Sequence, residues 1–287
     1  MPIDTSRTID NSQTLKPSSN SHESTPYCLT VPLYSLDKII LPQSTLHSIE
    51  NFLSYQNHSS LIFDQWGLSS THAQQRQIAI NLYGKSGTGK TMAAHAIAHA
   101  FGKPLIVVNY SEIESKYVGE TSKNLTALFE MAVQKEAIIF FDEADAMLSR
   151  RVTNMSHSTD VSVNQTRSVL LTLMNDHEGL IIFTTNFIEN YDPAFMRRIL
   201  THILFELPDF DSRRRLWQAY IPKGLPHNVS IDELAEISEG LSGSDISNCV
   251  LKAAFSTARE GLAVVPIEKF IESVNEVKAS HSANQFK

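Results

Sequence analysis

The sequence contains little cysteine and no long apolar run. Only two of its 287 residues are cysteines, Cys28 and Cys249, and they lie far apart in the chain. Small secreted domains usually depend on several disulfides, so we expect both thiols to stay reduced. No apolar run approaches the roughly 18 residues that a membrane span requires, and the N-terminus lacks the apolar stretch of a secretory signal. The composition therefore predicts a cytoplasmic protein without a membrane span.

The sequence also lacks an excess of basic residues. It has 24 Lys and Arg against 31 Asp and Glu, which gives a formal net charge of −7. Proteins that bind duplex nucleic acid usually carry a basic excess, so the overall charge argues against a nucleic-acid partner and leaves only a local basic patch open. Hydrophobic residues make up 42% of the chain, which is sufficient for one large or two modest globular domains.

Composition changes along the chain and indicates four parts. Residues 1–26 are rich in Ser, Thr and Asn and have almost no apolar anchors, so we expect a disordered tail. Residues 27–60 form an N-terminal arm whose helix begins near Pro42, and this arm could pack on the body or hold a partner. We expect an α/β domain at 61–210 and a helical domain at 211–287.

Short apolar runs alternate with helical patterns in the α/β part. The runs are 78–83, 105–108, 137–141, 180–185 and 202–207. Such an order predicts a parallel sheet that is buried on both faces by helices. Beyond Pro208 only helical patterns remain, at 212–220, 231–239, 244–260 and 266–277, which predicts a small all-helical domain.

The first apolar run ends in a phosphate-binding pattern, G-x-x-x-x-G-K-T. It consists of Gly84, Lys85, Ser86, Gly87, Thr88, Gly89, Lys90 and Thr91. Glycines let the backbone approach a phosphate chain closely, and the following helix adds the positive end of its dipole. Lys90 supplies a charge for the phosphates and Thr91 a hydroxyl for Mg²⁺. Considered alone, the pattern also fits a glycine-rich turn before a helix.

Polar residues follow two later apolar runs. Asp142 and Glu143 come directly after residues 138–141. Near a phosphate-binding loop, Asp142 could bind Mg²⁺ largely through water, and Glu143 could act as general base toward the attacking water. Asn186 ends the next run and could hold that water, although a turn-forming Asn fits as well.

Two further segments are ambiguous without context. Arg197 and Arg198 precede the last apolar run, where they could form an ordinary solvated pair. An arginine beside a transferring phosphoryl group can raise the rate by about 10³–10⁵. Lys116, Tyr117 and Val118 follow the second run and also fit a surface loop.

Together, the motifs resemble the AAA+ ATPases. The residues that carry the resemblance are Gly84–Thr91, 138–143, 184–186, 192–198 and 243–246. They are similar in identity, order and spacing to the branch that contains membrane-protease ATPases, katanin, spastin and the ESCRT-disassembly ATPase. The resemblance covers about three-quarters of the chain and implies a P-loop NTPase core with a helical lid.

The resemblance also implies roles for single residues. Asp142 and Glu143 would be the Walker B pair and Asn186 the sensor 1 residue. Arg197 and Arg198 would be arginine fingers that act on nucleotide held by the neighbouring subunit, which implies a ring, usually a homo-hexamer.

Three more segments take their roles from the same resemblance. Gly243 and Ser244 would lie near the adenine. Gln65–Gly67 stands where relatives contact the adenine, although its residues differ from theirs. Lys116, Tyr117 and Val118 would form a pore loop that grips an extended polypeptide. The Asp-Gly-Phe signal that links subunits in relatives is absent near Asn175–His177.

The sequence therefore predicts an ATPase that uses ATP and Mg²⁺ to remodel or unfold a protein in a ring. Two alternatives stay open: a nucleic-acid remodelling ATPase such as a helicase or clamp loader, and a nucleotide-gated binding module without sustained turnover. The acidic balance and Tyr117 argue against the first, and the presence of Glu143, Asn186 and Arg197 argues against the second.

Overall fold

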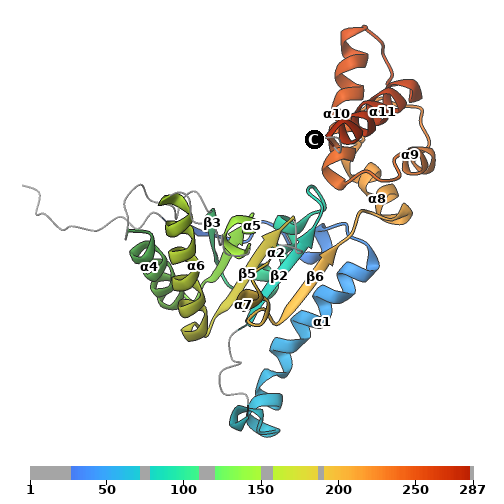
Figure 1. The fold of residues 1–287 in the computed structure, drawn as a ribbon. Helices are drawn as coiled ribbons and strands as arrows, with labels where there is room; N and C mark the ends of the chain where they lie inside the picture. Colours follow the sequence, from blue (N-terminus) through green and yellow to red (C-terminus); the bar gives the residue numbers. More distant parts are fainter. Residues whose placement is uncertain (1–26, 72–77, 110–119, 150–157, 187–190, 285–287) are drawn as a thin grey trace, which may run out of the picture.

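The fold is taken from a computed structural model that describes residues 27–71, 78–109, 120–149, 158–186 and 191–284. The proposed tail at 1–26 and the proposed pore loop at Lys116–Val118 lie outside these residues. The described chain forms an α/β core and a separate helical lid (Figure 1). No helix within the described ranges is both long and apolar enough to cross a membrane.

A six-stranded sheet forms the centre of the core, in the order β1-β3-β4-β5-β2-β6. Its strands are β1 (Leu29–Thr30), β2 (Ile78–Gly84), β3 (Leu105–Asn109), β4 (Ile138–Asp142), β5 (Leu180–Thr185) and β6 (Thr201–Phe205). Five strands are parallel, as expected, and β1 from the arm adds an antiparallel edge beside β3. The sheet is therefore mixed.

Helices cover both faces of the sheet, and neighbouring residues of β4 show this directly. Phe140 packs in one cluster with α1 (Gln43–Ser60) and α2 (Lys90–Ala100). Phe141 packs in the other, with α4 (Glu120–Gln134), α5 (Asp145–Leu148) and α6 (Ser158–Asp176). Burial on both faces explains why these strands read as continuous apolar runs.

Two helices of the core begin before the first residue of their apolar pattern. The apolar positions that recur at helical spacing start at Leu125 and Val169, whereas α4 begins at Glu120 and α6 at Ser158. The early residues of both helices are mostly polar, so apolar periodicity does not mark them. The short helices η1 (Leu36–Lys38), η2 (Leu61–Gln65), η3 (Leu68–Ser70) and α7 (Pro193–Met196) complete the core.

The lid consists of four helices with a core of their own. They are α8 (Phe210–Tyr220), α9 (Ile231–Ile237), α10 (Gly243–Arg259) and α11 (Ile267–Asn284). Trp217 is fully buried, meets Phe270 edge-on and donates its Nε1–H to Ser238 Oγ at 2.9 Å. The lid follows β6 directly, so it stands beyond the carboxyl ends of the parallel strands (Figure 1).

The arm joins the core to the lid. Ile39 and Leu41 are buried in the same cluster as α1 and α2, whereas Ile40 packs against the apolar core of the lid. The backbone at Ile39 is extended, and successive side chains of an extended segment point in opposite directions. This segment therefore contacts both domains at the point where they meet.

Candidate functional site

The phosphate-binding pattern forms the turn between β2 and α2. Gly84 has φ of 143°, and a Cβ there would lie 2.2 Å from the carbonyl oxygen of Phe205 on β6. Gly87 has φ of 76°, and a Cβ there would lie 2.0 Å from Ser244 Oγ in the lid. These two positions require glycine for both their conformation and their close packing.

Lys90 begins α2, and its ammonium group folds back over the loop. Nζ donates to the carbonyl oxygens of Gly84 and Lys85 at 2.7 and 2.9 Å, and to Asn186 Oδ1 at 3.0 Å. Burial lowers the pKa of Lys90, and the carboxylates of Asp145, Asp142 and Glu143 partly oppose this shift. The ammonium is thus held where a phosphate chain lying on the loop would meet it.

The two carboxylates at the end of β4 lie beside this loop. Thr91 Oγ1 is 3.2 Å from Asp142 Oδ2, and the hydroxyl of Thr184 on β5 donates to Asp142 Oδ1. A carboxylate next to a threonine hydroxyl is an oxygen donor set of the kind that Mg²⁺ prefers. Glu143 follows with φ of 52°, a left-handed conformation that is uncommon for residues other than glycine and often occurs at functional sites.

Asn186 reaches the same site from the end of β5. Its backbone N–H donates to the carboxylate of Asp145 at 3.1 and 3.2 Å, and its side-chain oxygen accepts from Lys90. The sheet order places β5 between β4 and β2. Asn186 therefore lies between the carboxylates and the loop.

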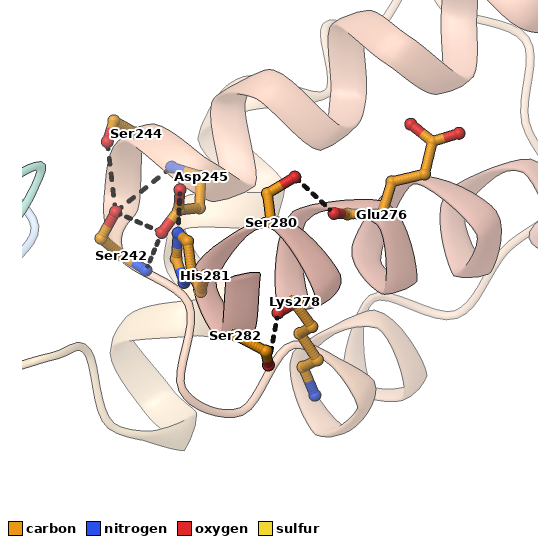
Figure 2. Close-up of polar contacts among 8 residues, drawn as sticks. All are labelled: Ser242, Ser244, Asp245, Glu276, Lys278, Ser280, His281 and Ser282. Carbon is orange, nitrogen blue, oxygen red and sulfur yellow. Dashed lines mark hydrogen bonds and ion pairs between the residues drawn. The ribbon is translucent and has the colours of Figure 1, made fainter. Parts of the chain in front are cut away.

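The first turn of α10 closes the site from the lid side. Ser244 N–H donates to Gly87 O at 3.2 Å. Ser242 and Asp245 form a reciprocal cap at the start of α10, and His281 Nε2 of α11 lies 3.3 Å from Asp245 Oδ1 (Figure 2). Gly243 and Ser244 are therefore in direct contact with the phosphate-binding loop.

These segments enclose a cleft of about 390 Å³, which is within the usual range for small-molecule sites. Its apolar wall comes from Ile39–Leu41 in the arm and from Leu216 and Tyr220 of α8. Gln65–Gly67, which we expected near the adenine, is not among the described residues that line the cleft. The structure does not bring this segment to the cleft, because α1 begins beside the cleft residue Pro42 and leads away from it to this segment at its other end (Figure 1). The sequence feature that could have identified this wall is the apolar run Ile39–Leu41 before Pro42.

Arg197 and Arg198 do not join the cleft. They follow α7 and precede β6, and the N–H of Leu200 donates to Ala79 O near the start of β2. Ala79 lies about 17 Å along the strand from Gly84. Arg198 is held within the chain, since Nε donates to Asn175 Oδ1 at 2.7 Å and Nη1 to Ala194 O at 2.9 Å. Arg197 is exposed, and within the described residues its guanidinium makes no hydrogen bond or ion pair.

Two known protein families match the sequence. Residues 80–207 match the ATPase family associated with various cellular activities (AAA), and residues 228–272 match the AAA+ lid domain. The proteasome-activating nucleotidase of Saccharolobus solfataricus is 35% identical over 209 residues, which are 70% of this chain and 53% of the relative. The proteasome-activating nucleotidase of Methanopyrus kandleri is 34% identical over 216 residues, which are 72% of this chain and 49% of the relative. The chain thus spans about half the length of the curated relatives it matches.

Solved structures share the fold. The crystal structure of the FIGL-1 AAA domain has a TM-score of 0.70 at 23% identity, covering 88% of this chain and 86% of that one. The FIGL-1 AAA domain in complex with ADP has a TM-score of 0.59 at 25% identity, covering 74% of this chain and 82% of that one. The chain therefore contains an AAA ATPase domain followed by an AAA+ lid domain, in the order that the sequence motifs led us to expect.

Proposed function

We propose that this protein binds ATP with Mg²⁺ in the cleft, hydrolyses it, and uses the energy to remodel or unfold a protein substrate within a ring of identical subunits. The observation that carries the proposal is the convergence of Lys90, Asp142, Glu143 and Asn186 on one phosphate-binding loop. The domain match and the relatives named as proteasome-activating nucleotidases support a nucleotide as the ligand.

Each residue has a chemical task in this proposal. The loop N–H groups and Lys90 receive the phosphates, while Thr91 and Asp142 would hold Mg²⁺. When bound, Mg²⁺ neutralises negative charge on the phosphate oxygens. Glu143 takes a proton from the attacking water, and Asn186 orients that water. The apolar wall of Ile39–Leu41 suits a flat aromatic base.

Ring assembly is supported by the position of the arginines. A side chain at the amino-terminal end of β6 is too far from its own loop to contact phosphates there. Arg197 is nevertheless exposed, and its guanidinium makes no hydrogen bond or ion pair with the described residues. An arginine in that position can complete the site of a neighbouring copy in a heterologous, ring-closing interface.

The protein substrate is inferred from the segment Lys116–Val118. A ring of tyrosines would grip an extended chain through apolar contact and stacking, without regard to its sequence. This part of the proposal rests on the sequence pattern alone.

The proposal is tested with Glu143→Gln, which removes the base and keeps the size of the side chain. We expect tight ATP binding and a loss of turnover of at least about 10²-fold. Turnover by the natural protein should rise with protein concentration as rings form. Equal turnover by both proteins would contradict the enzyme proposal, and turnover that depends on DNA would favour the nucleic-acid alternative.

A further inference from the structure

We infer that Thr184 is a positioning residue that holds Asp142 in the geometry needed for Mg²⁺ and Glu143 in the geometry needed for water activation. This inference deepens the proposed function and rests on it. Thr184 lies on β5, 42 residues from Asp142 in the sequence, so no local pattern connects the two residues.

Three hydrogen bonds join Thr184 to the end of β4. Its hydroxyl donates to Asp142 Oδ1, and the same oxygen accepts the backbone N–H of Glu143 at 3.1 Å. Its backbone carbonyl accepts the N–H of Ala144 at 2.9 Å. Thr184 therefore contacts three consecutive residues that include both carboxylates.

The Thr184 hydroxyl acts both as a hydrogen-bond donor and as an acceptor at this position. A hydroxyl has one proton to donate and lone pairs that can accept. Its proton is committed to Asp142 and a lone pair to Glu143, and the residue is only 1% exposed, so no competing water is needed to satisfy it. A valine of the same shape could provide neither bond.

These bonds act on the two features that the chemistry requires. Thr184 holds Asp142 Oδ1, and the carboxylate then faces Thr91, whose Oγ1 lies 3.3 Å from Oδ1 and 3.2 Å from Oδ2. The N–H of Glu143 is fixed while this residue has φ of 52°, a conformation that needs support from its surroundings. Removing the hydroxyl would free the carboxylate to rotate and weaken the support for Glu143.

The neighbouring Thr185 shows that a buried threonine at the end of β5 does not necessarily bond to a carboxylate. Thr185 is also 1% exposed, but its hydroxyl is directed toward Asn81 Oδ1 at 3.4 Å rather than toward a carboxylate. Only Thr184 bridges β5 and the carboxylate pair by a side-chain hydroxyl among the described contacts.

The test measures binding of a fluorescent, non-hydrolysable ATP analogue as Mg²⁺ is titrated, with parallel measurements in EDTA. Thr184→Val should need about tenfold more Mg²⁺ for half of the Mg²⁺-dependent effect, as is typical when a residue that orients a metal ligand is lost. Affinity in EDTA should be nearly unchanged, because Lys90 and the loop are intact. Thr184→Ser, which keeps the hydroxyl, should restore most of the Mg²⁺ response.

Thr257→Val is the matched control, since Thr257 is also buried and its hydroxyl donates to the carbonyl of Ala253 within α10. It should behave as the natural protein. Thr184→Ala repeats the comparison if the valine variant does not fold. If Thr184→Val or Thr184→Ala needed no more Mg²⁺ than the natural protein for half of the effect, this inference alone would be overturned. If Mg²⁺ had no effect on binding of the analogue to the natural protein, the proposed function would be overturned as well.

Discussion

The Nζ atom of Lys90 lies 3.0 Å from Oδ1 of Asn186, and this contact joins two segments that are 96 residues apart in the sequence. It connects the phosphate-binding loop to the end of β5. Both groups face the cleft, so a phosphate chain and its attacking water would lie beside a cation and an amide whose positions are already set. Such preorganisation lowers the cost of orienting the reacting groups.

Asn186→Ala should slow ATP turnover by about 10²-fold, because one preorganised polar group beside the developing charge is lost. Nucleotide affinity should change little, since Lys90 keeps its contacts with the loop. Steady-state turnover and equilibrium binding measured together test this. Asn248→Ala, at an exposed position of α10, is the control. A large loss of affinity with unchanged turnover would contradict the assigned role.

Gly87→Ala should weaken nucleotide binding more than Gly102→Ala does, although the two changes should destabilise the fold to a similar extent. The new Cβ would meet Ser244 Oγ and Ser242 Oγ, which pushes the lid away from the loop. Gly102→Ala is the matched control, because φ is 65° there and nothing lies within 4 Å of a Cβ. Both should lose about 1–2 kcal/mol of stability from the left-handed backbone. Equal nucleotide affinities for the two variants would show that lid contact at Gly87 is unimportant.

Arg197→Ala should be inactive alone but should regain turnover when mixed with inactive Glu143→Gln. In a mixed ring, a subunit with intact Glu143 can receive Arg197 from its neighbour. Random mixing in equal amounts creates such pairs at about a quarter of the interfaces, provided that the interfaces are heterologous. Turnover is measured against the mixing ratio. Absence of any recovery, with assembly verified, would argue against action across the interface.

Arg198→Ala should differ from Arg197→Ala in its effect on folding. Arg198 donates to Asn175 and Ala194, and loss of these bonds should cost about 1 kcal/mol in the free energy of unfolding. Arg197→Ala removes no such bond and should leave that free energy unchanged. Chemical denaturation of the two variants at low protein concentration makes the comparison. Equal stabilities would show that the bonds of Arg198 contribute nothing measurable.

The stability of the protein should fall as the pH is lowered from about 6.5 to about 4. Burial, and to a smaller extent Lys103, lowers the pKa of His177 from 6.5 to about 4. Between these values the unfolded chain binds a proton that the folded chain does not, so the free energy of unfolding decreases by up to about 3 kcal/mol. Neither ring nitrogen of His177 has a hydrogen-bond partner in the described structure.

Denaturation of His177→Leu at several pH values tests this dependence. The slope should become shallower, although His95 and His202, whose pKa values are also lowered by burial, should keep part of it. His47→Leu, at an exposed position of α1, is the control and should keep the full slope. An unchanged slope in His177→Leu would exclude His177 as its source.

The sequence alone identified the residues that we propose for the chemistry and the elements that carry them. The loop from Gly84 to Thr91, the carboxylates Asp142 and Glu143, and Asn186 each follow an apolar run directly. Their placement depends on local rules: a buried strand is a continuous apolar run, and the polar residues that follow it lie at the sheet edge. The same rules predicted the five parallel strands and the helical lid.

The tertiary structure alone decided which side chains meet. The hydroxyl of Thr184 on Asp142, the amide of Asn186 on Lys90 and the wall formed by Ile39–Leu41 depend on the strand order β4-β5-β2 and on the path of the arm. Contacts between segments so far apart are set by how strands pair and domains pack, and spacing along the chain does not encode them. For the same reason the resemblance pointed to Gln65–Gly67 for the adenine contact, whereas the structure lines the cleft with Ile39–Leu41. Only packing against the lid distinguishes these two short segments.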